Sequence, residues 1–462
     1  MVNSAVDNSA VDNSASRASV LTDEAAIIAD KAALASAGRL YKRIWRWHFF
    51  AALLVVPFVL WQAITGTIYV WHEQIARSTH GSLMQVAPQL ARASYQAQLQ
   101  AAIAARPELK LEHIEVAAAA NASTLFMFEA ANGLPTPTFV NPYSAHVIAS
   151  VSPSAWIPGW SRALHGGWPI DPVGSWMLEL GASWAVVMIL TGLYLWWPRA
   201  ASGMAGVFYP RLKAGSRVFW RDVHSVIGMY FSIIVLVFLI TALPWTDVWG
   251  NQILKPIQRA LGQNAPAALG FGGGAHSEHA AAAGVSLLSL DQIIDSARSA
   301  GIASNLEIRL KPNGAPTAVR TRYARATAEQ YLQIDAYSGD IVARASWADF
   351  PILAKVISTG VDLHEGTFFG VLNQWFNTLV AAVLVWLSIS GFVGWYQRRP
   401  GAGLSAPRKI NVRWPKAIFV SAIAVCVALP LLGLSVAVIA LFEWISTRVI
   451  PVLNQKDNKA PM

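Results

Sequence analysis

The segment Leu164–Arg199, "LHGGWPIDPVGSWMLELGASWAVVMILTGLYLWWPR", places a histidine shortly before a long apolar run. The run has the length and composition of a helix that crosses a bilayer, for which about 20 apolar residues are needed. A second segment, Leu363–Arg398, "LHEGTFFGVLNQWFNTLVAAVLVWLSISGFVGWYQR", repeats the arrangement. Counted from His165 and from His364, the two segments share leucine, glycine, tryptophan and arginine at the same offsets. The chain therefore contains an internal duplication.

The composition places the chain among membrane proteins. Of its 462 residues, 54% are hydrophobic and only 13% are charged, which is too apolar for an ordinary soluble protein. We predict five transmembrane helices, over residues 45–72, 173–197, 223–246, 373–397 and 417–444. Many of the 20 tryptophans fall near the ends of these segments, where amphipathic rings suit the headgroup layer.

Lysine and arginine set the expected orientation. They cluster before the first helix and in the connections 198–222 and 398–416, which we therefore place in the cytoplasm. The segments 73–172 and 247–372 and the tail 445–462 then lie outside. We expect a multi-pass membrane protein with a cytoplasmic N-terminus and a C-terminus on the outer side. Because the net charge of +9 comes largely from these flanks, no nucleic-acid partner is needed to explain it.

The remaining segments have simpler compositions. Residues 1–44 repeat "VDNSA" and predict a disordered cytoplasmic tail. Each outer segment combines one helical pattern with several alternating strand patterns, and "PYSAHVIASVS" (142–152) matches "AYSGDIVARAS" (336–346). The expected fold class is thus a mixed membrane protein. It has an α-helical bundle of five transmembrane helices, the first four forming two repeats, and two small α+β domains outside.

Four histidines occupy duplicated positions. His48 and His224 open the first and third helices on the inner side, whereas His165 and His364 precede the second and fourth on the outer side. A repeat related by a pseudo-twofold axis brings equivalent residues together, and one haem iron can be held by two facing imidazoles. We predict the pairs His48 with His224 and His165 with His364, because about 30 Å of membrane separates the two faces. His72, at the outer end of the first helix, is a rival ligand for the outer site.

Other residues bear on which cofactors the chain could hold and on where they could bind. The single cysteine, Cys426, excludes disulfides, thiolate clusters and covalent c-type haem. Within the spans, Glu179 is a candidate proton carrier or quinol contact, with partial hydration as the simpler alternative. The helical glycines either leave room for a macrocycle or allow close helix packing; they are Gly66, Gly192 and Gly391. The linker pair His276 and His279 is a weaker metal-binding candidate.

The segments "VNPYSAHVIASV" (140–151), "IDAYSGDIVARA" (334–345), "FWRDVHSVIGMY" (219–230) and the opening stretch resemble the PepSY-associated transmembrane helix family, also called iron-regulated membrane proteins. The resemblance covers roughly residues 39–399. It implies PepSY-like domains in the periplasm and two haem b groups, one near each membrane face.

The resemblance also implies an activity. Members of this family include ferric-siderophore reductases, so electrons would cross the membrane to periplasmic ferric siderophore and release Fe(II). The chain has no flavin module, so quinol or a separate cytoplasmic reductase would be the donor. The alternative is a non-redox PepSY membrane protein that acts as a sensor, binds a protease or assists siderophore uptake.

Overall fold

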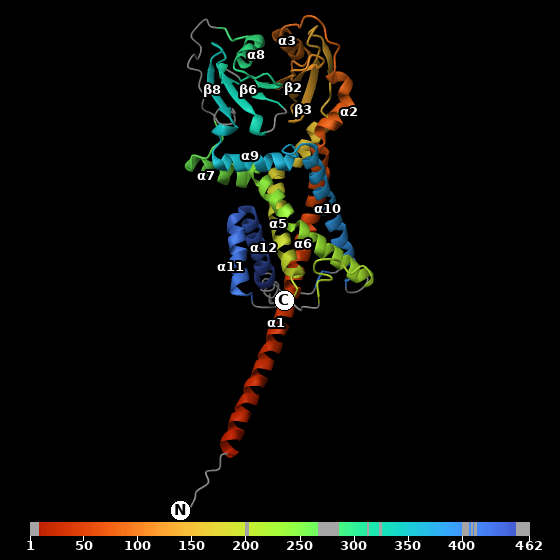
Figure 1. Ribbon diagram of the computed structural model, residues 1–462, viewed down its shortest axis with the longest axis vertical. Coiled ribbons are helices and arrows are strands. Elements are labelled where there is room, and N and C mark those ends of the chain that lie inside the picture. Colours follow the sequence, from red (N-terminus) through yellow and green to blue (C-terminus); the bar gives the residue numbers. More distant parts are fainter. Residues whose placement is uncertain are drawn as a thin grey trace, which may run out of the picture. The chain divides into compact units, whose positions relative to one another are not determined.

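The computed structural model describes residues 9–198, 203–266, 286–311, 314–322, 326–399, 406–407, 410 and 414–449. Among them, five helices are long and apolar enough to cross a membrane, as the sequence predicts (Figure 1). They belong to α1 (Ser9–Val70), α5 (Val173–Trp196), α6 (Ser216–Ala242), α10 (Val371–Tyr396) and α12 (Pro430–Trp444).

The N-terminal segment differs from its prediction. The sequence predicts disorder over 1–44, but α1 is helical from Ser9. The alanine-rich stretch "EAAIIADKAALASA" (24–37) gives a physical reason, because alanine has the highest intrinsic helix propensity.

The prediction of one helix over 417–444 is wrong. Two helices occupy this region, α11 (Lys416–Ala428) and α12, and they lie side by side (Figure 1). Pro430 has no backbone N–H and so ends α11, and a Cβ on Gly433 would come within 2.7 Å of the Cys426 carbonyl oxygen. Trp184 of α5 anchors the hairpin by donating from Nε1 to the Ser435 hydroxyl at 3.1 Å. The periplasmic location of the C-terminus stays a prediction.

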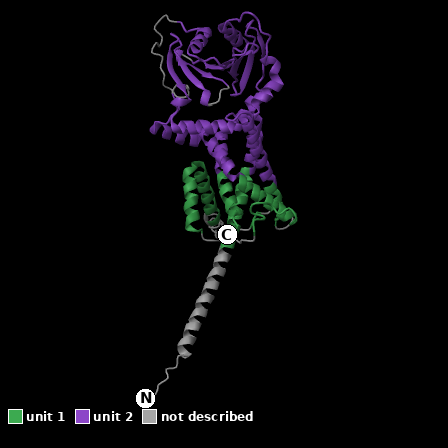
Figure 2. Ribbon diagram, in the orientation of Figure 1, with its two compact units in different colours: residues 1–55, 184–230, 390–462 green, residues 56–183, 231–389 purple. Residues whose placement is uncertain are grey.

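The chain divides into two compact units (Figure 2). Unit 1 comprises residues 1–55, 184–230 and 390–462, and it holds one end of four apolar helices together with the hairpin. Unit 2 comprises residues 56–183 and 231–389, and it holds the other ends and all of the sheet.

Unit 2 contains one antiparallel sheet of eight strands. Its strand order is β4-β3-β2-β1-β5-β6-β7-β8, so two four-stranded halves meet where Ile114 of β1 lies opposite Ile308 of β5. The strands are β1 (Lys110–Val116), β2 (Thr124–Glu129), β3 (Pro135–Val140), β4 (Val147–Ser150), β5 (Leu306–Arg309), β6 (Thr317–Thr321), β7 (Gln330–Ile334) and β8 (Ile341–Ser346).

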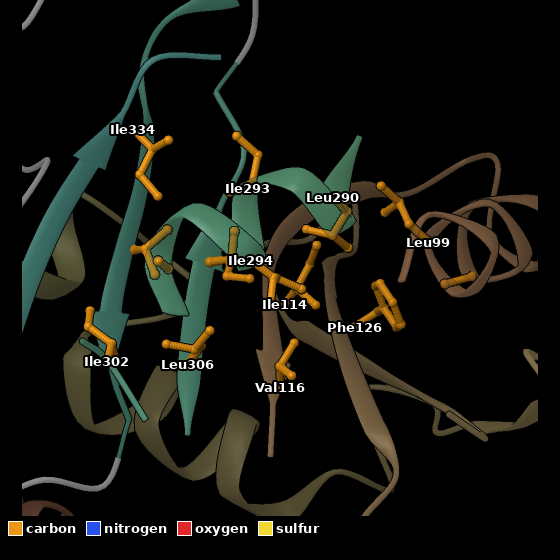
Figure 3. Packing of buried hydrophobic residues seen from close by; sticks show 14 of the residues in the cluster. Leu99, Ile114, Val116, Phe126, Leu290, Ile293, Ile294, Ile302, Leu306 and Ile334 are labelled. Atoms are coloured by element: carbon orange, nitrogen blue, oxygen red, sulfur yellow. The ribbon is translucent and has the colours of Figure 1, made fainter. Parts of the chain in front are cut away.

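Two helices cover one face of this sheet, α3 (Tyr95–Ala105) and α8 (Leu290–Ser299). Leu99 of α3 and Ile293 of α8 pack with Phe126 and Ile114 in one hydrophobic core that spans both halves (Figure 3). The Asp291 carboxylate of α8 accepts hydrogen bonds from two backbone N–H groups at the start of α3, at 2.8 and 2.9 Å. The two halves therefore share a core and fold as one body.

Shorter elements complete the description. They are α2 (His72–Met84), α4 (Ile157–Gly166), η1 (Leu243–Trp245), η2 (Asp247–Leu254), α7 (Lys255–Ala260), η5 (Ala326–Ala328), η6 (Trp347–Asp349), α9 (Ile352–Glu365) and η7 (Ile445–Val449). The glycines that follow the two outer histidines, Gly167 and Gly366, end α4 and α9 with left-handed φ angles of 114° and 83°. The shared glycine offset in the sequence is therefore a helix C-cap.

Candidate functional site

The inner pair of histidines lies within unit 1. His48 of α1 and His224 of α6 face each other with ring centres 6.5 Å apart and planes at 78°. Each ring has a hydroxyl partner on another helix. Nδ1 of His48 lies 3.0 Å from the Thr191 hydroxyl of α5, and Nδ1 of His224 lies 3.1 Å from the Ser390 hydroxyl of α10.

The outer pair lies within unit 2. His165 ends α4 and His364 ends α9, and their ring centres are 6.3 Å apart with planes at 57°. Nδ1 of His165 lies 3.1 Å from the Thr65 hydroxyl of α1, and Nδ1 of His364 lies 3.3 Å from the Thr241 hydroxyl of α6. The outer pair thus has the same type of partner as the inner pair.

Both outer imidazoles are neutral near pH 7. Burial lowers the pKa of His165 and of His364 to about 4, and the neighbouring imidazole of His364 adds to the effect on His165. Neutral imidazole is the form that binds metals, so burial keeps these side chains ready to act as ligands.

Glycines give three of the four imidazoles their space. A Cβ added to Gly66, Gly192 or Gly391 would lie 2.8, 3.3 or 3.1 Å from Cε1 of His165, His48 or His224, respectively. Each of these glycines directly follows the hydroxyl residue that contacts the same ring. The histidine ring fills the space that each glycine leaves. This is the role of the three glycines, which the sequence left open.

The spacing of both pairs fits one metal held between two imidazoles. With a metal–nitrogen bond of about 2.0–2.1 Å and about 1.1 Å from a ring nitrogen to the ring centre, the two centres should lie roughly 6.3 Å apart. The measured separations are 6.5 Å and 6.3 Å. Among the described residues no group of three or more His, Cys, Asp or Glu could hold a metal. Two axial nitrogens are what a haem requires from the protein, so the residues present fit this group.

A protein-family model described as the PepSY-associated TM region matches residues 45–398. The chain belongs to this family. All four paired histidines and their four hydroxyl partners fall inside the matched range. The PepSY-associated TM protein is a multi-pass membrane protein, in agreement with its five apolar helices. No curated protein matches the chain in a sequence comparison.

His72 does not join the outer pair in this PepSY-associated TM protein. Its Nδ1 lies 2.7 Å from the Tyr69 carbonyl oxygen, which can only accept, and its ring stacks on Tyr69 with centres 4.8 Å apart. His72, the first residue of α2, is therefore held by Tyr69 near the end of α1.

Glu179 has a structural partner. Its buried carboxylate accepts hydrogen bonds from the backbone N–H groups of Val248 and Trp249, at 3.2 and 3.0 Å. These groups open η2, where unpaired N–H groups favour an anion. Glu179 thus binds the first turn of η2, whose N-cap is Thr246, a role that the sequence did not suggest. The other weak metal candidates, His276 and His279, lie outside the described residues.

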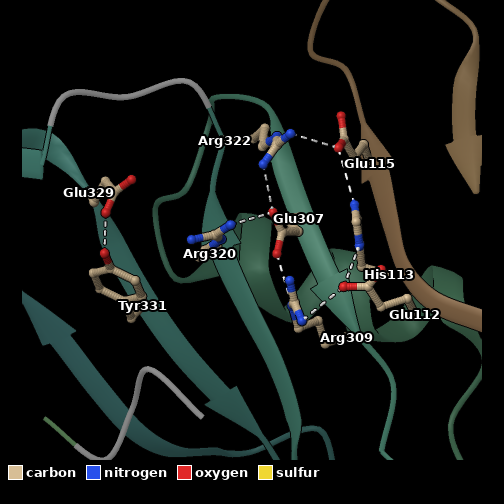
Figure 4. A network of polar contacts seen from close by, with 9 residues as sticks. All are labelled: Glu112, His113, Glu115, Glu307, Arg309, Arg320, Arg322, Glu329 and Tyr331. Atoms are coloured by element: carbon tan, nitrogen blue, oxygen red, sulfur yellow. Dashed lines mark hydrogen bonds and ion pairs between the residues drawn. The ribbon is translucent and has the colours of Figure 1, made fainter. Parts of the chain in front are cut away.

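Sequence reasoning missed a buried polar network in the PepSY-associated TM protein. His113 is only 8% exposed and lies between Glu115, at 3.2 Å, and Glu112, at 3.7 Å. These side chains close a ring across β1, β5 and β6 (Figure 4). Its members are Glu112, His113, Glu115, Arg322, Glu307 and Arg309, with Arg320 as a further partner of Glu307. Alternation was the signal for four of them, because His113 and Glu115 of β1 and Glu307 and Arg309 of β5 alternate with core residues, whereas Glu112 lies at an irregularity of β1.

Proposed function

We propose that this protein is a haem b-containing oxidoreductase of the inner membrane that passes electrons across the bilayer and reduces ferric siderophore in the periplasm. The observation that carries the proposal is the pairing of four histidines from distant parts of the chain. Both pairs have the centre-to-centre spacing of two imidazoles on one metal. One pair lies in each compact unit, and the proposal assigns one haem to each pair.

The protein's own residues supply binding and orientation. His48 and His224 would hold the inner haem, and His165 and His364 the outer one, while bound haem supplies reversible one-electron chemistry at its iron. The two imidazoles of each pair come from different helices, and their ring centres lie 6.5 Å apart in the inner pair and 6.3 Å apart in the outer pair. Reduction of Fe(III) to Fe(II) takes up one electron and weakens the hold of hard oxygen ligands, which favours release of the metal.

The mirrored strand order supports the finer architecture that we propose. Each half of the chain would contribute an apolar helix, one PepSY-like domain with a helix on four strands, and a second apolar helix. In this arrangement the two PepSY-like domains are the two halves of the joined sheet. The donor in this proposal is quinol or a separate cytoplasmic reductase.

Absorption spectra of purified protein, first air-oxidised and then reduced with dithionite, test the proposal. We expect b-type bands, a haem content near two per chain, and loss of about half of that haem in the His165→Ala and His364→Ala variants. His146→Ala, which changes an exposed histidine of a turn, is the matched control and should keep the full content. Protein without haem, or full haem content in both site variants, would overturn the assignment and favour the non-redox alternative.

A second measurement tests the substrate. Proteoliposomes supplied with reduced quinol should convert a ferric hydroxamate or catecholate chelate to Fe(II), trapped by a ferrous-specific chelator. Haem-loaded protein that reduces no ferric chelate from any donor would contradict the siderophore part of the proposal while leaving the haem part intact.

A further inference from the structure

All four paired histidines have a hydroxyl at Nδ1, at 3.0, 3.1, 3.1 and 3.3 Å. The hydroxyls belong to Thr191, Thr65, Ser390 and Thr241, and none is on the same helix as its histidine. We propose that these four residues are positioning residues that hold each imidazole in the Nδ1–H form and direct Nε2 to the metal. The inference rests on the proposed function for its metal, but the tautomer that it assigns belongs to the protein alone.

Each of the three threonine hydroxyls already donates its proton to a backbone carbonyl of its own helix. Thr65 Oγ1 donates to the Trp61 carbonyl at 2.8 Å, Thr191 Oγ1 donates to the Val187 carbonyl at 2.8 Å, and Thr241 Oγ1 donates to the Phe238 carbonyl at 3.0 Å. A hydroxyl has one proton, so each of these oxygens can only accept at the imidazole. The imidazole must therefore carry its proton on Nδ1, and the lone pair is on Nε2.

The arrangement has a consequence for the bound metal. A hydrogen bond from the outer N–H of a metal-bound imidazole fixes the ring and raises its basicity. A more basic axial ligand favours ferric over ferrous iron, so each hydroxyl should lower the midpoint potential of the haem that its histidine holds. The glycine after three of the hydroxyls lets the ring approach closely enough for this bond to form.

Thr65 offers the sharpest test because a matched residue lies two positions along the same helix. Thr67 also donates to a carbonyl four residues earlier, at 2.7 Å to Ala63, and contacts none of the four histidines. We expect Thr65→Val to lower the haem affinity of the outer site by about tenfold and to raise its midpoint potential. Thr65→Ser, which restores the hydroxyl, and Thr67→Val should both remain close to wild type. An unchanged potential in Thr65→Val, or an equal change in Thr67→Val, would overturn the positioning role.

A measurement on haem-free protein separates this inference from the proposed function. With ¹⁵N-labelled histidine, the nitrogen shifts of haem-depleted protein distinguish the Nδ1–H from the Nε2–H form. We expect His165 to be in the Nδ1–H form, and Thr65→Val to raise the share of the Nε2–H form. An Nε2–H form in the wild type contradicts the inference even if haem binds, and an Nδ1–H form supports it even if haem does not.

Discussion

At the scale of single residues, each half of a pair combines a histidine with a hydroxyl from another helix, and in three cases with a glycine as well. Gly66 is the tightest position, because a Cβ would lie 2.8 Å from Cε1 of His165, whereas beside Gly192 the distance is 3.3 Å. Contacts below about 3 Å force a shift, and overpacking a buried site commonly costs about 1–3 kcal/mol. The three glycines should therefore differ in their tolerance of a methyl group.

We predict a graded series for alanine at these glycines. Gly66→Ala should displace His165 and lose most of the outer haem, Gly391→Ala should reduce the inner haem partly, and Gly192→Ala should have the smallest effect. Haem-to-protein ratios of the purified variants measure the order. Gly394→Ala is the control, since its Cβ would meet nothing within 4 Å on the same helix as Gly391. Equal haem contents in all four variants would contradict this account.

The sequence could predict the histidines but not their partners. Duplication marks His165 and His364 because their flanking residues share offsets over more than thirty positions. Their hydroxyl partners Thr65 and Thr241 lie 100 and 123 residues away along the chain, so no local pattern connects them. The sequence left His72 as a lower-ranked rival for the outer site. Only the fold shows that its ring is held by Tyr69.

At the scale of elements, the ring of charges links the strands at which the two halves of the sheet meet. Glu307 of β5 is 1% exposed and accepts from three arginines, Arg309, Arg320 and Arg322, at 2.9, 2.6 and 3.0 Å. Burial alone would raise the pKa of Glu307, but the charge of Arg320 and its hydrogen bond outweigh it and lower the pKa to about 2. This carboxylate therefore stabilises the fold as an anion.

The lowered pKa of Glu307 determines how the stability of the fold depends on pH. A carboxylate whose pKa is lower in the folded state contributes its stability above its usual pKa and loses it as the pH falls toward the folded value. Between about pH 4.5 and pH 2, wild-type protein should lose about 3 kcal/mol of the stability that Glu307 supplies. Glu307→Gln should be about 2–4 kcal/mol less stable at pH 7. Its free energy of unfolding should change less than that of wild type between about pH 4.5 and pH 2.

Hydrogen exchange of the β5 amides across this pH range measures the effect locally. The control is Glu108→Gln, since Glu108 is 59% exposed and lies 3.8 Å from Arg106. An exposed pair of this kind contributes less than about 1 kcal/mol, so its removal should leave exchange of β5 unchanged. Protection of β5 that is equal in Glu307→Gln and wild type at pH 7 would refute the stabilising role.

Secondary structure was predictable where the pattern is local. The long apolar runs predict the helices α1, α5, α6 and α10, because a run of about 20 apolar residues forms few structures other than a transmembrane helix. The pairing of β1 with β5 was not predictable, since the two strands lie far apart in sequence and each half looks complete alone. Pro430 was visible in the sequence, but whether a helix bends or folds back at a proline depends on contacts such as that of Gly433 with Cys426.

At the scale of the whole molecule, the two histidine pairs occur in different compact units. We therefore predict that they bind haem independently. The double variant His48→Ala, His224→Ala should keep about half of the haem, with the outer site still reducible by dithionite but no longer by a donor on the cytoplasmic side. Potentiometric titration of the variant should resolve one redox transition in place of two. Complete loss of haem would show instead that the sites depend on each other.

Each pair also draws one histidine from the residues before 200 and one from the residues after it, since His48 and His165 face His224 and His364. The hydroxyls divide in the same way, with Thr65 and Thr191 in the first part and Thr241 and Ser390 in the second. A half-length polypeptide would thus carry one ligand for each centre and complete neither. Two copies of such a half, related by a twofold axis, would be needed to complete both pairs, whereas in the single chain each histidine meets its partner at any protein concentration.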